Sequence, residues 1–244
     1  MAFQSYRAVV DRIHDLTHDV REIDCHLIDP KEIVFKAGQF ISFEIIPAEA
    51  TRSVVRPYSI ASPPQQDQVI RIVLNRVPGG IGSGFLFGLN PGDRLTFKGP
   101  VGSFYVRDPT RDLLFVATGT GIAPIRSMIL GLLHHGHKGS IRLYWGLRSQ
   151  RDLYYQEELE RLGRQYPNFA STVTLSRPEG AWQGPEGRVT RLVEEGVQSV
   201  KNLAVYLCGN NAMIRDVTAL INQKGLCPVY REIYYDDPGG KPDD

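Results

Sequence analysis

The chain has 244 residues, with 28 Lys+Arg against 27 Asp+Glu and a formal net charge of +1 at pH 7. This length allows one large domain or two modest ones, at roughly 100–200 residues per domain. The balanced charge gives no electrostatic case for binding nucleic acid or coating an anionic membrane. No run approaches the roughly 18 apolar residues that span a bilayer, and no secretory apolar block follows Met1. We therefore expect a cytoplasmic protein without membrane insertion.

The three cysteines, Cys25, Cys208 and Cys227, are widely separated in the sequence. Their spacing fits neither a CxxC zinc knuckle nor the cysteine run of a plant-type iron–sulfur cluster. An odd count also argues against a disulfide framework. The sequence thus predicts that this chain carries no cluster and no metal site of its own.

Up to about residue 108 the sequence predicts short strands separated by Pro, Gly, Asp and Asn. Regular strands with frequent turn signals are typical of a small antiparallel barrel. One short helix is expected over 83–89, directly after a glycine-rich stretch. The expected strands are 6–13, 20–28, 39–46, 54–61, 68–77 and 94–99.

After the predicted hinge at Asp108-Pro109-Thr110, apolar runs alternate with amphipathic stretches. This alternation predicts an α/β domain, in which helices cover both faces of a parallel sheet. The expected domains are a barrel over 1–108, an α/β domain over 109–235 and a disordered tail over 236–244. The expected strands are 113–117, 141–145, 170–175 and 204–208, and the expected helices are 122–135, 155–165 and 211–223.

The turn Gly119-Thr120-Gly121 follows a buried strand and opens a helix, with Pro124 in its first turn. Backbone N–H groups at such a turn favour a phosphate. The third glycine of the G-x-G-x-x-G fingerprint is absent, and Arg148 follows the next strand where an acidic residue would bind a ribose. From the residues alone, a phosphate site and a plain tight turn are equally good interpretations.

A second candidate site lies in the barrel half, at Arg56-Pro57-Tyr58-Ser59. An arginine fork, a flat aromatic ring and a hydroxyl on one strand can address a phosphate, a planar ring and a ring heteroatom. Gly80 and Gly82 allow close backbone approach, and Ser83 is expected to cap the short helix. The alternative is an ordinary barrel strand followed by a glycine turn.

Five motifs in order give this chain its resemblance to a known family. It resembles the ferredoxin–NADP reductase superfamily, above all bacterial ferredoxin or flavin reductases and the reductase components of oxygenases, from about Tyr6 to Tyr235. The motifs are Arg56-Pro57-Tyr58-Ser59, Gly80-x-x-Ser83, Gly99-Pro100-Val101-Gly102-Ser103-Phe104, Gly119-Thr120-Gly121-Ile122-Ala123-Pro124 and Tyr206-Leu207-Cys208-Gly209-x-x-x-Met213.

The resemblance implies an FAD-binding barrel, a nicotinamide-binding α/β domain and hydride transfer between the two cofactors. Arg56 would bind the flavin pyrophosphate, Tyr58 would pack beside the isoalloxazine and Ser59 would hydrogen-bond near N5. The same resemblance assigns the remaining residues: Pro57, Gly80, Gly82 and Ser83 to the flavin, and Gly119, Thr120, Gly121, Pro124, Cys208, Gly209 and Met213 to the dinucleotide.

Two features of the resemblance stay open. Near the C-terminus, Glu232 and Tyr234 match an acidic residue and an aromatic that covers the flavin, but Tyr235 is an equal candidate for the cover. Ser176-Arg177, with Arg148 nearby, resembles a pair that binds the 2′-phosphate of NADPH, which puts NADPH slightly ahead of NADH. Arg177 as a solvated loop residue is the alternative.

The implied catalytic residues are Ser59, Cys208, Glu232 and Tyr234. With no sequence assigned to a cluster, we expect electrons to leave to a ferredoxin or another electron-acceptor protein. Two rivals remain: a flavin reductase that uses flavin as a dissociable substrate, and an electron-relaying subunit of a larger complex.

His134-His135-Gly136-His137 invites a metal interpretation. It lies at an expected helix end, where glycine and imidazolium are both favoured. No carboxylate or cysteine completes a ligand set there, so we interpret it as a helix terminus.

Overall fold

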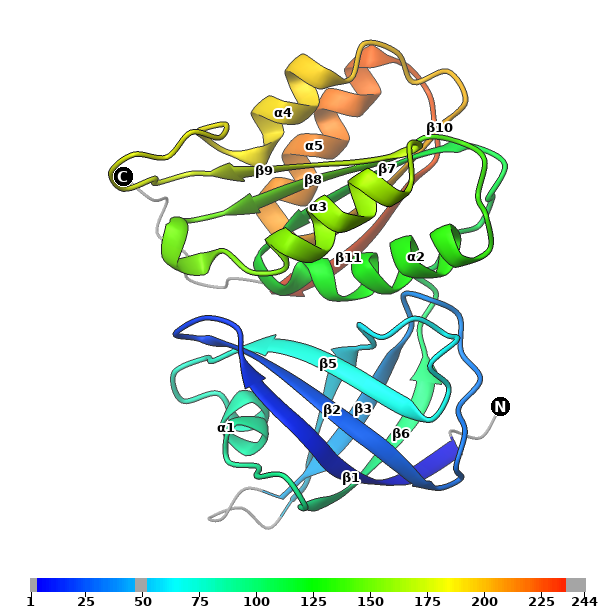
Figure 1. The fold of residues 1–244 in the computed structure, drawn as a ribbon, viewed down its shortest axis with the longest axis vertical. Helices are drawn as coiled ribbons and strands as arrows, with labels where there is room; N and C mark the ends of the chain where they lie inside the picture. The colour runs from blue at the N-terminus through cyan, green and yellow to red at the C-terminus, as the bar shows by residue number, and fades with distance from the viewer. Residues whose placement is uncertain (1–3, 47–51, 236–244) are drawn as a thin grey trace. The chain divides into compact units, whose positions relative to one another are not determined.

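The computed structural model describes residues 4–46 and 52–235, and the side chain of Tyr235 is outside the description. The chain folds into two compact units (Figure 1). The first comprises the chain up to Arg107 together with Ala123–Gly136, and the second comprises Asp108–Ile122 and the chain from His137. No helix within the described ranges is long and apolar enough to cross a membrane.

The first unit is built on six antiparallel strands in the order β4-β3-β6-β1-β2-β5. The two ends of this order meet, because Ile60 forms a bridge with Ile72 and the amide of Ala61 donates to the Arg71 carbonyl over 2.8 Å. The predicted antiparallel barrel is confirmed. Its strands are β1 (Gln4–Asp15), β2 (Val20–Asp29), β3 (Phe40–Ile45), β4 (Val54–Ser59), β5 (Val69–Asn75) and β6 (Arg94–Val101).

Alternation along these strands builds the barrel core. On β2, Ile23, Cys25 and Leu27 are buried in the apolar cluster, whereas Glu22 and Asp24 point to the other face. Cys25 therefore behaves as a small buried hydrophobe.

Helix α1 (Ile81–Phe87) begins two residues earlier than the sequence predicted. Its N-cap is Gly80, so the expectation that Ser83 caps the helix is wrong. Ser83 instead lies inside the first turn, where its hydroxyl accepts a hydrogen bond from the Val77 amide over 3.1 Å. The serine thereby fixes the glycine-rich loop from within.

Helix α2 (Ile122–His134) belongs to the first unit from Ala123 onward. It ends near Gly136, which has a positive φ of 68°. The expected helix terminus at the histidine cluster is confirmed. The predicted domain boundary near residue 108 stays a prediction. The compact units follow it only in part, because they place most of α2 with the barrel.

The second unit is a parallel sheet in the order β11-β10-β7-β8-β9. Helix α3 lies on one face, and α4 and α5 lie on the other (Figure 1). The predicted parallel sheet is confirmed. The elements are β7 (Asp112–Thr118), the 3-10 turn η1 (Gly119–Gly121), β8 (Ile141–Leu147), η2 (Gln150–Asp152), α3 (Gln156–Gln165), β9 (Phe169–Leu175), α4 (Val189–Gly196), β10 (Leu203–Asn210), α5 (Asn211–Lys224) and β11 (Val229–Tyr235).

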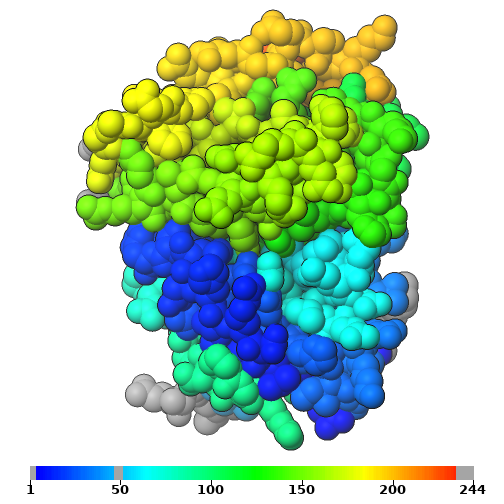
Figure 2. Space-filling view, viewed as in Figure 1, coloured from blue at the N-terminus to red at the C-terminus, as the bar shows by residue number. Residues whose placement is uncertain are grey.

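In the space-filling view, β1, β2 and β5 form the near side of the first unit, in blue and cyan (Figure 2). Helix α3, in yellow-green, covers the near side of the second unit's sheet. Each unit thus has its own core and its own covering layer.

Candidate functional site

The second unit reverses its strand order at β7. Strands β8 and β9 lie on one side of β7, and β10 and β11 lie on the other. In such sheets ligands bind outside the carboxyl ends of the two strands that flank the reversal. Here these ends carry Gly119 and Gly209, so the structure brings together the two glycine-bearing strand ends that the sequence singled out.

Glycine is required where these strand ends approach each other. A Cβ on Gly121 would overlap the carbonyl oxygen of Cys208 and lie 2.6 Å from its carbonyl carbon. Gly209 has φ of +136°, and a Cβ there would overlap the Thr118 hydroxyl. The Asn210 amide donates to Thr118 Oγ1 over 2.9 Å. The two strand ends therefore approach closely at the glycines and are joined by the Thr118 hydroxyl.

The carbonyl oxygen of Gly119 is fixed by two hydrogen bonds, whereas the space beside its Cα is open. Its carbonyl oxygen accepts hydrogen bonds from Trp145 Nε1 over 3.0 Å and from the Tyr154 hydroxyl over 3.2 Å. Its φ is +51°, and a Cβ on Gly119 would meet no atom within 4 Å. This open space at the start of η1 and α2 is a cradle that suits a phosphate of a dinucleotide.

Three side chains meet at the carboxyl end of β10 and β11. Cys208 pairs with Glu232 in the strand register, and Tyr234 hydrogen-bonds to the Cys208 side chain. Burial raises the pKa of the Cys208 thiol well above its ordinary value, and the Glu232 carboxylate raises it further. The thiol therefore stays neutral and is no nucleophile.

Glu232 is the unusual group of this cluster. Burial raises the pKa of its carboxyl from 4.5 to about 7. Its Oε2 is buried without a hydrogen-bond partner among the described residues. A buried carboxyl that lacks a partner and titrates near neutrality is characteristic of a functional site.

The barrel carries a second candidate site. Arg56 and Tyr58 share one face of β4, and Gly82 of α1 faces both: a Cβ on Gly82 would overlap the Tyr58 hydroxyl and lie 3.0 Å from Arg56 Cγ. Ser59 is buried and points to the opposite face, as expected from strand alternation. Arg56, Tyr58 and Gly82, which the sequence singled out in two separate segments, therefore lie on one surface.

The Arg56 guanidinium is exposed on this surface. Its Nη1 donates to the carbonyl oxygen of Val55 over 3.0 Å, and no carboxylate among the described residues pairs with it. An arginine with a planar fork and no acidic neighbour suits a pyrophosphate. Arg56 and the surface at Gly82 and Tyr58 together form a site that fits FAD.

A third group lies at the carboxyl ends of β8 and β9. The Arg177 amide donates to the Arg148 carbonyl over 2.7 Å, and Ser176 is bound to the end of β8 in the same way. Gln150 fastens this loop by accepting from the Glu179 amide over 2.8 Å. Ser176, Arg177 and Arg148 are all exposed, so the predicted cationic group is brought together in one place.

The other residues of the candidate site lie at helix starts or on strands. Asn210 caps α5 by accepting from the Ala212 and Met213 amides over 2.8 and 3.3 Å. Pro124 lies in the first turn of α2. Pro57 is exposed on β4, and the Tyr235 side chain is outside the described residues, so which tyrosine covers the flavin stays a prediction.

Sequence reasoning missed Thr118, Trp145 and Tyr154. The hydroxyl of Thr118 joins β7 to β10, and the other two side chains support the Gly119 carbonyl. None of these residue types signals a binding site by itself. Their roles come from the parallel register, which places β8 and the segment after it beside the end of β7.

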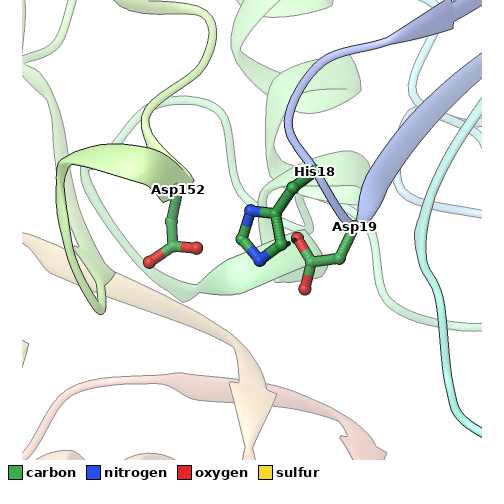
Figure 3. A group of neighbouring side chains, drawn as sticks. All are labelled: His18, Asp19 and Asp152. Atoms are coloured by element: carbon green, nitrogen blue, oxygen red, sulfur yellow. Dashed lines mark ion pairs between the residues drawn. The ribbon is translucent and has the colours of Figure 1, made fainter.

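Figure 3 draws three side chains with metal-ligand chemistry, His18, Asp19 and Asp152. Both aspartates have roles within their own units. Asp19 accepts from the Thr17 hydroxyl over 2.9 Å in the β1–β2 turn. The Asp152 carboxylate accepts from the amide and hydroxyl of Ser149 over 2.8 and 3.1 Å and so caps η2. We assign no metal to these residues.

Comparison with known proteins identifies the two domains of the chain. An oxidoreductase FAD-binding domain model matches residues 7–105, and an oxidoreductase NAD-binding domain model matches residues 115–219. The chain belongs to the ferredoxin–NADP reductase superfamily. It is an FAD-dependent NAD(P)H oxidoreductase, as the ordered motifs implied.

Several members of this superfamily resemble the chain over most of its length. Ferredoxin–NADP reductase B of Sorangium cellulosum is 34% identical over 225 residues, which cover 89% of this chain and 91% of that protein. The ferredoxin–NAD(P)+ reductase component of a Pseudomonas putida naphthalene 1,2-dioxygenase system is 33% identical, covering 96% of this chain and 70% of the relative. The cytochrome P450 reductase GcoB of Amycolatopsis superposes with a TM-score of 0.86 at 26% identity, covering 95% and 70% of the two chains.

Proposed function

We propose that this reductase takes hydride from NADPH or NADH and passes electrons to a ferredoxin or a similar separate carrier protein. The support is the similarity to two ferredoxin reductases that cover 89% and 96% of the chain. The observations that carry the proposal are two glycine-formed surfaces, one in each unit: Arg56 and Gly82 form the first, and Gly119 and Gly209 form the second.

The barrel surface would hold FAD. Arg56 would neutralise the pyrophosphate with its planar fork, and Gly82 would leave room beside Tyr58 for the cofactor to lie against the backbone. Tyr58 would supply a flat apolar face, and Ser59 a hydroxyl. Bound FAD supplies the conversion from two-electron hydride chemistry to one-electron transfer.

The switch point between β7 and β10 would hold the nicotinamide dinucleotide. Gly119 and Gly121 would offer backbone amides to the pyrophosphate. Cys208 would present a small neutral side chain, which lets a planar ring approach the strand end. Glu232 would hold a proton at its carboxyl near neutral pH, because its pKa is about 7.

The finer choice of donor is NADPH, and Ser176, Arg177 and Arg148 would bind its 2′-phosphate. All three are exposed at one strand edge, where an added phosphate finds cationic donors without desolvating them. We also propose a cytoplasmic location, because the three cysteines are all free, as thiols are in a reducing compartment.

The proposal is tested by anaerobic mixing of the purified protein with NADPH or NADH, followed by a plant-type ferredoxin and cytochrome c as the final acceptor. We expect cytochrome c reduction that needs both the nicotinamide and the ferredoxin, with a lower KM for NADPH. Oxidation of nicotinamide that proceeds only when free flavin is added would favour a flavin reductase. No oxidation of either nicotinamide would favour a relaying subunit.

A further inference from the structure

Two buried side chains of α2 bind the barrel directly. Arg126 Nη1 donates to the carbonyl oxygen of Ala61 over 2.7 Å, and the hydroxyl of Ser127 donates to the carbonyl oxygen of Ser62 over 2.7 Å. Arg126 is 7% exposed, and Ser127 and Ser62 are fully buried. Hydrogen bonds in such a setting are costly to break, because the lost partner leaves a buried polar group unsatisfied.

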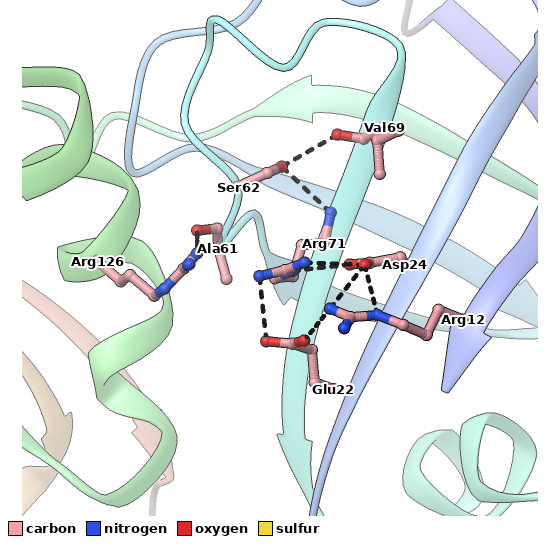
Figure 4. Close-up of polar contacts among 8 residues, drawn as sticks. All are labelled: Arg12, Glu22, Asp24, Ala61, Ser62, Val69, Arg71 and Arg126. Carbon is pink, nitrogen blue, oxygen red and sulfur yellow. Dashed lines mark hydrogen bonds and ion pairs between the residues drawn. The ribbon is translucent and has the colours of Figure 1, made fainter. Parts of the chain in front are cut away.

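Ser62 joins this contact to the strands of the barrel (Figure 4). Its hydroxyl accepts from the Arg71 amide over 3.1 Å and donates to the Val69 carbonyl over 3.2 Å, which fixes the 61–62 segment on β5. The segment that receives the two bonds from α2 is therefore itself held at several atoms.

An ionic cluster with buried carboxylates then holds β5 to the neighbouring strands. The Arg71 guanidinium binds Asp24 with Nε–Oδ1 of 2.7 Å and Glu22 with Nη1–Oε2 of 3.4 Å. Arg12 binds the same two carboxylates over 3.2 and 2.9 Å. Figure 4 shows the continuous path from α2 through Ala61 and Ser62 to this cluster.

This path joins two points that matter for the reaction. Arg126 and Ser127 lie in the second turn of α2, whose start is covalently continuous with the Gly119–Gly121 turn. Ala61 and Ser62 come directly after Ile60 and the flavin strand β4, which ends at Ser59. Two short hydrogen bonds thus connect a point just past the nucleotide turn with a point just past the flavin strand.

Stability alone is a poor reason for this arrangement. Buried ionic and polar networks contribute little net stability compared with apolar packing of the same volume, and their best-attested use is to fix one geometry. Hydride transfer depends steeply on geometry, since a misplacement of about 1 Å can cost about 100-fold in rate.

We propose that Arg126 and Ser127 are positioning residues for hydride transfer, which fix the start of α2, and with it the adjoining nucleotide turn, through the carbonyls of Ala61 and Ser62. They touch neither cofactor in this account. The inference rests on the proposed function, because the placement of the turn matters for rate only if a nucleotide bound there gives up hydride.

The test compares Ser127→Ala with a matched variant, Gln65→Ala. Gln65 Nε2 contacts His135 Nε2 over 2.9 Å, so it also joins the barrel to α2, but at the helix end far from the nucleotide turn. Both proteins are purified with FAD. The rate of flavin reduction is then measured at saturating NADPH and NADH by stopped-flow absorbance, and amide hydrogen exchange is measured over residues 118–125.

We expect Ser127→Ala to keep its FAD and its Kd for the nicotinamide, and to lower the limiting reduction rate by at least about 10-fold. Amides of the nucleotide turn should exchange faster by a similar factor, with or without nicotinamide. Ser127→Thr, which keeps the hydroxyl, should restore both values, and Gln65→Ala should match the wild type.

Unchanged limiting rate and unchanged exchange in Ser127→Ala would overturn the inference. If Ser127→Ala loses FAD altogether, Arg126→Lys decides by the same two measurements, because it keeps the charge and most of the stem. The exchange measurement needs no turnover. A wild-type protein that neither nicotinamide reduces would therefore contradict the proposed function, while the exchange data would still decide whether the two residues hold the turn.

Discussion

Gly82 of α1 packs against Tyr58 of β4 so closely that a Cβ on the glycine would overlap the phenol oxygen. The same Cβ would lie 3.0 Å from Arg56 Cγ and 3.2 Å from Arg56 Cβ. The absence of one side chain thus allows the helix and the strand to form one surface, which we propose binds the flavin.

A methyl group at this contact should disturb the flavin site without unfolding the barrel. In Gly82→Ala, Tyr58 and Arg56 must move together, and we expect FAD to bind about 10-fold more weakly, corresponding to about 1.4 kcal/mol. Gly84→Ala is the matched control, since it lies on the same helix and its Cβ would meet nothing within 4 Å. Equal FAD affinity in the two variants, by fluorescence titration, would show that the contact does not shape the site.

Arg56 should contribute most of the charge at the pyrophosphate. Loss of charge-assisted hydrogen bonds typically costs about 1.5–3 kcal/mol, so Arg56→Ala should weaken FAD binding by about 10- to 100-fold. Arg56→Lys should recover only part of this loss, because lysine lacks the planar fork. Arg94→Ala removes an exposed arginine from another barrel strand and should retain full flavin content after gel filtration. Retention by Arg56→Ala as well would contradict the assignment.

The strand ends at the switch point tolerate no side chain at position 121. A Cβ in Gly121→Ala would meet main-chain atoms of Cys208 and Gly209, which cannot move without separating β7 from β10. We expect NAD(P)H affinity to fall by at least about 10-fold and the protein to lose about 1–3 kcal/mol of stability through overpacking. Gly163→Ala, in which the new Cβ lies 4.0 Å from its nearest neighbour, should leave the NAD(P)H affinity from isothermal titration unchanged and should not lower the melting temperature, because alanine is favoured over glycine inside a helix. Normal NAD(P)H binding by Gly121→Ala would disprove the glycine requirement.

The raised pKa of Glu232 should make the free energy of unfolding depend on pH. Its pKa is raised from 4.5 to about 7 by burial, so the folded protein holds a proton that the unfolded chain releases. The stability from this group is full below about pH 4.5 and is lost as pH rises through about 7, by at most about 3 kcal/mol. Glu232→Gln should therefore gain in melting temperature relative to the wild type between pH 5 and pH 8. Glu157→Gln, at an exposed position, should keep the wild-type dependence of melting temperature on pH. The same dependence in Glu232→Gln would mean that burial does not raise the pKa of the Glu232 carboxyl.

The proposed NADPH preference depends on the exposed cationic edge at β8 and β9. Arg177→Ala should raise the KM for NADPH by about 10-fold or more, as expected for one lost charge-assisted contact, with little change for NADH. Arg164→Ala removes an exposed arginine from α3 and should change neither value. Equal effects on NADH and NADPH would show that Arg177 does not recognise the 2′-phosphate.

Much of this fold was readable from periodicity, and particular residues show where the reading stopped. Every strand of the barrel was predicted, because alternating apolar residues and turn signals are local properties. Strand β11 was missed, since its exposed Arg231 and half-buried Glu232 hide its pairing with β10. Helix α4 was missed because it is short and its N-cap Arg188 makes no side-chain cap. The capping role given to Ser83 was wrong, since the helix starts at Ile81 after Gly80.

The residues of the candidate site were likewise only partly predictable from the sequence. Motif glycines marked Gly82, Gly119 and Gly121, but the reasons for them are features that sequence does not reveal. The main-chain atoms of Cys208 require Gly121, the phenol oxygen of Tyr58 requires Gly82, and a positive φ favours Gly119. The links from Arg126 and Ser127 to the barrel carry no sequence signal at all, because they end on main-chain carbonyls.

The central claim is that this chain holds FAD as a bound group and reduces it with a nicotinamide. The most direct measurement is the visible absorption spectrum of the purified protein after gel filtration, before and after anaerobic addition of NADPH or NADH. The account predicts a flavin spectrum that survives the column and bleaches on mixing. A colourless protein that consumes NAD(P)H only when free flavin is added would contradict it.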